Sequence, residues 1–113
     1  MPYTELVSGL KNSRFKNICV MTGAGISTSA GIPDFRSPGT GTYDRIEFLT
    51  GVKLPYPEAL YDIRFFLKNP EVYYTYRRER LKEFDFTNEV FPTPSHFFIK
   101  LLFEKKMVHR VFT

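Results

Sequence analysis

The sequence lacks several features that would assign it to common protein classes. Tryptophan is absent, and the single cysteine, Cys19, cannot form an intrachain disulfide or a four-cysteine zinc site. No apolar run approaches the ~18–20 residues of a membrane span, and the N-terminal stretch has no apolar core of a secretory signal. These absences favour a globular protein of a reducing compartment that neither crosses a membrane nor depends on disulfides.

Composition places the chain among globular proteins of modest positive charge. Its 113 residues allow at most one domain, and 42% of them are hydrophobic. The 12 phenylalanines and 7 tyrosines predict a sizeable core. The formal net charge of +4 suits an anionic ligand or a basic surface, but it does not by itself indicate nucleic acid.

The most informative stretch runs from Thr22 to Ser37 and reads TGAGISTSAGIPDFRS. It follows the apolar run 17–21, which predicts a buried strand with Cys19 as a structural thiol. A strand that breaks into a glycine-rich turn and a short helix is typical of a phosphate cradle. Glycines let a ligand approach the backbone, and N–H groups at the helix start face the anion. An acidic, an aromatic and a basic side chain follow closely at 34–36.

Local signals divide the rest of the chain into helices and a second strand. We expect a helix over 4–13 capped by Thr4, helical turns within 23–31, and an irregular loop rich in proline and glycine over 32–43. Prolines mark the start of further helices over 57–68, from 70 to about 82, and from 94 to the lysines at 105 and 106. The two predicted strands cover 17–22 and 108–113.

The predicted order is therefore strand, phosphate loop, helical excursion, helix and strand. Parallel strands need such a crossover, so the fold class is α/β, with a parallel sheet and a helical insertion. Two strands leave that sheet incomplete, because parallel strands are normally buried on both faces. We interpret the chain as part of a longer domain, and expect it to be loosely folded or prone to aggregation when alone.

The glycine turn and the polar triplet together resemble one family. GAGIS followed by GIPDFRS is similar to the sirtuins, the NAD-dependent protein-lysine deacylases, and within them to the eukaryotic branch with cytosolic and nuclear members. The resemblance covers 15–113 and includes SPGTGTYD at 37–44, LPYPEA at 54–59, FLKNP at 66–70 and TPSHFF at 93–98. It implies the N-terminal part of a Rossmann-like parallel-sheet NAD-binding domain, located in the cytoplasm or nucleus.

The resemblance also assigns segments and roles. Residues 15–43 would form the NAD-binding loop region, 44–92 a helical module, and 93–113 a helix and the second strand. The backbone of 24–28 would hold the NAD pyrophosphate and ribose. Asp34 would bind the nicotinamide carboxamide, Phe35 would shield the reactive ribose face, and Arg36 would orient phosphate or a mobile loop. Tyr43 would be a cofactor lid or a packed aromatic. The implied cofactor-binding residues are Gly23, Ala24, Gly25, Ile26, Ser27, Thr28, Ile32, Asp34, Phe35, Arg36 and Tyr43.

The implied chemistry is transfer of an acyl group from a protein lysine, on a histone or another protein, to the ADP-ribose of NAD, with release of nicotinamide. The family's base histidine and four zinc-ligating cysteines would lie beyond residue 113, so zinc is expected only in a longer protein. His96 opens a predicted helix, where a capping or packing role is expected, and His109 lies outside any motif. We therefore expect this chain to bind part of NAD without deacylating a substrate.

Several alternatives stay open at this stage. The turn alone is also compatible with a tight strand-to-helix connection, and Asp34 with a residue that caps its own loop. Phe35 is also compatible with simple core packing, and Arg36 with a surface ion pair. A non-catalytic module that binds NAD or ADP-ribose is a second function. A plain dehydrogenase fits less well, because Thr28 replaces the third glycine of G-x-G-x-x-G.

The helix from 70 to about 82 carries a further alternative. Its interleaved tyrosines and cations are typical of single-stranded nucleic-acid binding, but also of an amphipathic helix whose cations are solvated or paired with Glu79 and Glu83. The side chains concerned are Tyr73, Tyr74, Tyr76, Arg77, Arg78, Arg80 and Lys82.

Overall fold

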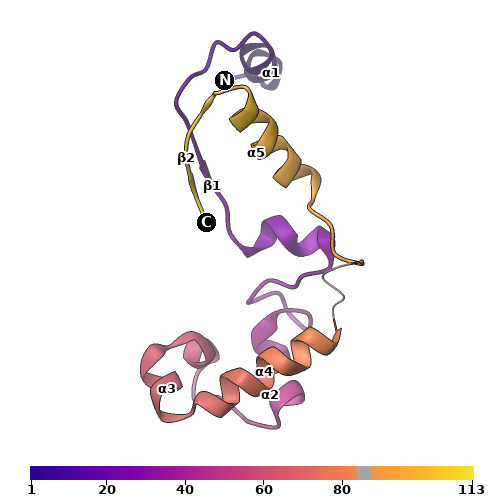
Figure 1. Cartoon of the computed structure of the whole chain (residues 1–113), viewed down its shortest axis with the longest axis vertical. Helices are drawn as coiled ribbons and strands as arrows, with labels where there is room; N and C mark the ends of the chain where they lie inside the picture. The colour runs from indigo at the N-terminus through magenta and orange to yellow at the C-terminus, as the bar shows by residue number, and fades with distance from the viewer. Residues whose placement is uncertain (84–87) are drawn as a thin grey trace. The chain divides into compact units, whose positions relative to one another are not determined.

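The computed structural model describes residues 1–83 and 88–113. By its internal contacts the chain forms two compact units: unit 1 contains 1–26 and 92–113, and unit 2 contains 27–91. Within the described ranges, no helix has the length and apolar character needed to cross a membrane. Figure 1 labels most of the elements, which in chain order are α1 (Tyr3–Lys11), β1 (Ile18–Met21), η1 (Ala24–Ala30), α2 (Thr42–Thr50), η2 (Pro57–Tyr61), α3 (Ile63–Lys68), α4 (Pro70–Glu83), α5 (Pro94–Glu104) and β2 (Val108–Phe112).

Unit 1 is built on two parallel strands. β1 pairs with β2 in parallel, with Ile18 opposite Val108 and Met21 opposite Phe112, and with an irregularity in the ladder just after Ile18. α5 leads directly into β2, so the two strands are joined by a crossover that contains all of unit 2. The expected α/β class and the parallel open sheet are confirmed.

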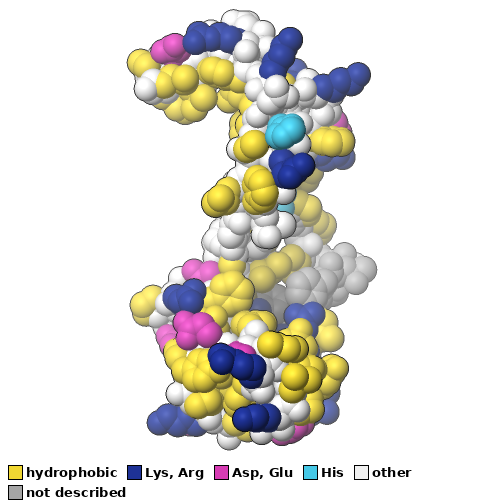
Figure 2. All heavy atoms as spheres, turned by 90° about the vertical axis from the view of Figure 1, so that its left-hand side faces the viewer, with side chains coloured by type: hydrophobic (Ala, Val, Ile, Leu, Met, Phe, Trp, Pro, Cys, Tyr) yellow, Lys and Arg dark blue, Asp and Glu magenta, His cyan; other side chains and the backbone are white. Residues whose placement is uncertain are grey.

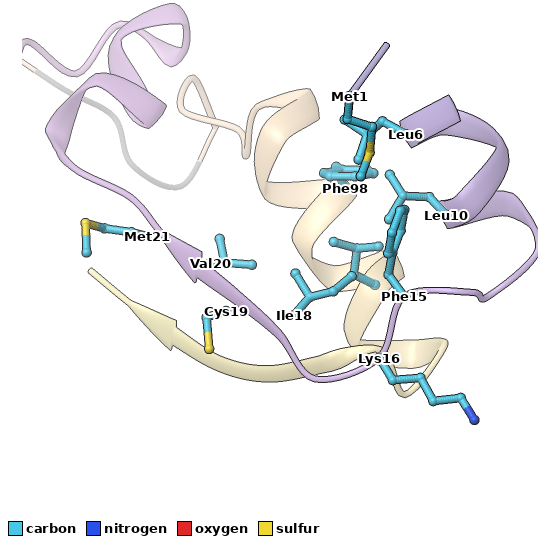
Figure 3. Close-up of a pocket in the computed structure, with 11 residues that line it drawn as sticks. Met1, Leu6, Leu10, Phe15, Lys16, Ile18, Cys19, Val20, Met21 and Phe98 are labelled. Carbon is cyan, nitrogen blue, oxygen red and sulfur yellow. The ribbon is translucent and has the colours of Figure 1, made fainter. Parts of the chain in front are cut away.

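β1 is less buried than its apolar sequence predicts. Ile18 and Val20 are half-buried, whereas Cys19 and Met21 are exposed. Successive side chains of a strand point to opposite faces. Figure 3 shows Ile18 on the side of α1 and α5, close to Phe15. The prediction of a buried Cys19 thiol is wrong, because no described element covers the face that Cys19 shares with Met21.

An apolar hollow of about 650 Å³ lies between α1, β1 and α5 (Figure 3). Leu10, Phe15 and Phe98 are among the side chains that line it. α5 has the predicted helical spacing, but Leu102 is its one buried residue, and Phe97, Phe98 and Leu101 are exposed. At the other end of the chain, α1 begins at Tyr3 after Pro2, so Thr4 lies inside the helix and the predicted Thr4 cap is wrong.

The core of unit 2 is small and joins α2, η2 and α4. Ile46, Leu60, Val72 and Tyr76 form its buried cluster. Half-buried side chains surround them, namely Tyr43, Leu49, Leu54, Phe65 and Tyr73. Beside this cluster, Glu83 of α4 receives ion pairs from Arg45 of α2 and from Arg80, whose side chain is nearly buried. The apolar cluster and the ion pairs together hold α2 against α4.

Two local predictions need correction in unit 2, and so does one prediction for the whole chain. The helix expected over 57–68 is interrupted at Asp62, which separates η2 from α3 and accepts a hydrogen bond from the Arg64 backbone as the cap of α3. The irregular loop expected over 32–43 ends earlier, because α2 begins at Thr42. Tyr76 is the one aromatic among the described residues that is fully buried, so the predicted sizeable core is not found. Figure 2 shows many hydrophobic side chains at the surface instead.

The small core of unit 2 makes a direct prediction. Leu60 is 2% exposed, whereas Leu67 is 73% exposed. Leu60→Ala should lower the free energy of unfolding by about 2–5 kcal/mol, because it leaves a cavity in a core with little to refill it. The control Leu67→Ala should change the same free energy by less than about 0.5 kcal/mol. Urea denaturation followed by tyrosine fluorescence measures both, and equal losses would contradict this description of the core.

Candidate functional site

The glycine turn begins directly at the end of β1. The Thr22 N–H donates to the Phe112 carbonyl at 2.9 Å, which continues the strand ladder by one residue. The Ile26 N–H donates to the Gly23 carbonyl at 3.2 Å and closes the first turn of η1, which is a 3₁₀ helix. The predicted helical turns after the strand are confirmed. They place the first N–H groups of η1 at the carboxyl end of a parallel strand, where α/β folds bind their ligands.

Gly23 and Gly25 stand where the surrounding chain has no need of glycine. A Cβ built at either residue meets no other atom within 4 Å, and neither residue has a positive φ. Neither packing within the chain nor backbone conformation therefore explains the two glycines. Space beside an exposed backbone is what a phosphate group needs to reach N–H donors. The residues present thus fit the pyrophosphate of a dinucleotide.

The loop after η1 is folded back on itself by Asp34. The Asp34 carboxylate accepts hydrogen bonds from the Ser37 N–H at 3.0 Å and from the Ser37 hydroxyl at 2.6 Å. These bonds hold the pKa of Asp34 below its ordinary value, the hydroxyl bond having the larger effect. The Thr42 N–H donates to the Asp34 carbonyl at 2.7 Å, which closes the loop at the start of α2. The expectation that Asp34 can cap its own loop agrees with these contacts.

Phe35, Arg36 and Tyr43 form one cluster of side chains. The ring of Phe35 contacts the ring of Tyr43 at 5.7 Å and that of Tyr61 at 5.5 Å between centroids. The Arg36 guanidinium lies 5.4 Å from the centre of the Tyr43 ring and donates to the Glu58 carboxylate at 2.9 Å. Tyr43 is half-buried in the first turn of α2, so of its two expected roles the packed aromatic matches its position.

The two compact units divide the predicted cofactor residues. Gly23, Ala24, Gly25 and Ile26 belong to unit 1, and Ser27, Thr28 and Ile32 to unit 2. Unit 2 also brings together Asp34, Phe35, Arg36 and Tyr43. Sequence reasoning missed Glu58 and Tyr61, which contact Arg36 and Phe35 and complete this cluster of side chains in unit 2. The one signal for them was their position on the helical turn that Pro57 starts.

His96 has a structural partner, as expected. Thr93 and His96 form a capping box at the start of α5: the Thr93 hydroxyl accepts from the His96 N–H, and the Thr93 N–H donates to His96 Nδ1 at 3.1 Å. His109 lies exposed on β2. Neither histidine is therefore placed as a free base beside the residues above.

The cations of α4 are mostly paired with its own carboxylates. Arg78 and Lys82 both contact Glu79, at 3.5 and 2.8 Å, and Arg80 contacts Glu83 at 2.8 Å. These contacts match the amphipathic helix with paired cations and leave fewer charges for a nucleic-acid backbone. Among the described residues, no group of three or more histidine, cysteine or carboxylate side chains lies close enough together to hold a metal ion.

Comparison with known proteins gives one consistent match. The model of the Sir2 family matches residues 23–113. The chain is 43% identical over 109 residues to NAD-dependent protein deacetylase hst2 of Schizosaccharomyces pombe, and the aligned region covers 96% of this chain and 30% of the relative. It is 46% identical to NAD-dependent deacetylase sir2A of Dictyostelium discoideum, covering 96% and 20%. It is 45% identical to NAD-dependent protein deacetylase sirtuin-2 of Danio rerio, covering 90% and 25%.

The Asp34 contacts predict how the loop responds to acid. The pKa of Asp34 in the folded chain lies below its ordinary value of 3.8. The stabilisation of the loop by the hydrogen bonds from Ser37 is therefore complete above about pH 4, and it is lost as the pH falls through the folded pKa. An NMR titration of the Ser37 amide should show a midpoint below 3.8. The control Asp34→Asn should abolish this transition, since an amide still accepts from Ser37 but does not ionise. A midpoint at or above the ordinary value would contradict the two hydrogen bonds.

Proposed function

Because this chain belongs to the Sir2 family, we propose that it forms part of the NAD site of an NAD-dependent protein deacetylase. The observation that carries the proposal is the family match over 23–113, which begins at the glycine turn itself. The chain spans 20–30% of the length of the three relatives named above, so the deacetylase activity of a whole protein is part of the proposal.

The backbone of 24–28 would hold the NAD pyrophosphate and the neighbouring ribose, with Gly23 beside them. The open flanks of Gly23 and Gly25 support this role, because a ligand can approach there without meeting a Cβ. The N–H of Ile26 donates to the Gly23 carbonyl, a bond that shapes the turn. When bound, NAD would supply the ribose whose hydroxyl group receives the acyl group, while this chain would bind and orient it.

Asp34 would bind the nicotinamide carboxamide while still closing its loop. A carboxylate offers about four lone-pair sites, and Ser37 uses two of them. Asp34 is ionised at neutral pH, and its lowered pKa agrees with a carboxylate that acts purely as an acceptor, as donation from the amide requires. Phe35 remains 38% exposed beside Tyr43 and Tyr61, which leaves ring surface to shield the ribose face from water.

Arg36 would orient a phosphate or the loop around it. Its ion pair with Glu58 is exposed, with side-chain exposures of 69% and 51%. Solvent screens such an exposed pair and leaves it little net stabilisation, so an anionic ligand can replace the carboxylate at little cost. We further propose an acylated protein lysine, on a histone or another protein, as the substrate of the whole protein, and the cytoplasm or nucleus as its location.

The open glycines give a test that separates binding from folding. Gly25→Ala should not lower the melting temperature of the chain, because the added Cβ has open space and alanine restricts the unfolded chain, but it should weaken ADP-ribose binding about tenfold or more. Calorimetric titration measures the binding. The comparison variant is Gly41→Ala, whose Cβ would lie 2.7 Å from the Ser37 nitrogen and should lower the melting temperature. Undiminished ADP-ribose affinity in Gly25→Ala would contradict the cradle.

A second test separates binding from turnover. The purified 113-residue chain should bind ADP-ribose or NAD in calorimetry but release no nicotinamide from NAD with an acetyl-lysine peptide, since His96 is committed to the α5 cap. Nicotinamide release is measured by chromatography, with a chain lacking ADP-ribose affinity as the blank. Turnover would refute the predicted inactivity. If a whole protein that contains this chain bound NAD without turnover, the alternative of a non-catalytic binding module would hold.

A further inference from the structure

We propose that Thr93 is a positioning residue for the glycine turn, acting through the carbonyl of Ile26. The proposal rests on the proposed function, because the turn matters only if it holds a ligand. The observation is a hydrogen bond from the Thr93 hydroxyl to the Ile26 carbonyl oxygen, at 3.0 Å across 67 positions of sequence. Both residues belong to unit 1, and Thr93 is only 5% exposed.

The proton of the Thr93 hydroxyl has one suitable acceptor. Its oxygen lies 3.0 Å from the Ile26 carbonyl and 2.8 Å from His96 Nδ1. Nδ1 already receives the Thr93 N–H at 3.1 Å, and an imidazole nitrogen that accepts has a single lone pair in the ring plane. The carbonyl can only accept. The hydroxyl therefore donates to the Ile26 carbonyl, while His96 Nδ1 accepts the Thr93 N–H.

This bond is not needed for capping. A helix cap requires an acceptor for the backbone N–H groups of the first turn, and Thr93 meets that need by accepting from the His96 N–H. An aspartate would cap equally well, yet it has no proton to donate at neutral pH. The donated proton is thus a second use of the side chain, and it is directed at the turn that follows β1.

Holding one carbonyl orients the turn. In a trans peptide the C=O of one residue and the N–H of the next lie in one plane and point in opposite directions. Fixing the Ile26 carbonyl therefore fixes the peptide plane between Ile26 and Ser27, and with it the direction of the Ser27 N–H. The Ile26 N–H is in turn bonded to the Gly23 carbonyl, which extends the constraint back to the start of the turn. Thr93 thereby presets the direction of the N–H groups proposed to face the pyrophosphate, and a preset direction lowers the cost of ordering them on binding.

The experiment compares variants of Thr93 in this chain by calorimetric titration with ADP-ribose. Thr93→Val removes the donor and should weaken binding about three- to tenfold, the effect of losing one neutral hydrogen bond. Thr93→Ser keeps the hydroxyl and should bind like the unaltered chain. The matched control is Thr50→Val, which removes a hydroxyl bond to the Ile46 carbonyl at 2.7 Å within unit 2 and should leave affinity unchanged.

Thr93→Asp separates this role from capping and guards against a loss of folding. It keeps the cap acceptor, so α5 should remain intact by circular dichroism. The loss of ADP-ribose binding should persist in about 1 M salt, where repulsion between the new carboxylate and the anionic ligand is screened within about 3 Å. The NMR shift of the Ile26 carbonyl carbon should move in the Val and Asp variants and return with Ser. Unchanged affinity in Thr93→Val, or an unmoved Ile26 signal, would overturn the proposal. No ADP-ribose binding by the unaltered chain would refute the proposed function itself.

Discussion

The parallel pairing of β1 with β2 is the constraint from which the arrangement of unit 1 follows. Parallel neighbours cannot be joined by a tight turn, so the chain must return to the starting edge of the sheet before β2 begins. α5 makes that return, and its first residues therefore lie at the edge where β1 ends. The glycine turn begins at the same edge. The contact between Thr93 and Ile26 is thus a consequence of strand direction, although the two residues are far apart in sequence.

Local signals predicted the elements whose boundaries depend on local chemistry. β1, α4, α5 and β2 lie where the apolar runs and the prolines at 70 and 94 placed them. The break at Asp62 was missed, because its side chain competes for the backbone as a cap within a stretch of otherwise good helix formers. The exposure of Cys19 was missed for a different reason. An apolar run indicates a strand, but burial depends on what covers each face, and that is a tertiary property.

The candidate site could be predicted only in part, because some of its contacts are tertiary and leave no local signal in the sequence. The motif identified the turn and the triplet at 34–36 because their residues are consecutive. Their contacts come from distant parts of the sequence. Glu58 contacts Arg36 from 22 positions away, and Tyr61 contacts Phe35 from farther along the same unit. Thr93 contacts Ile26 across 67 positions, and no sequence periodicity predicts such contacts. A motif therefore gives the residues that touch a ligand sooner than those that hold them in place.

The glycines show how structure and sequence together narrow a functional assignment. Gly31 has a φ of +88°, and a Cβ at Gly41 would collide with the backbone of Ser37, so both are required by the chain's own conformation. Gly23 and Gly25 have neither requirement. Glycine gives the unfolded chain more conformational freedom and so lowers the stability of the fold, which means that a glycine without a role in the folded chain needs another reason to be present. Close approach of a ligand to the backbone is the reason that we propose, and it concerns Gly23 and Gly25 but neither Gly31 nor Gly41.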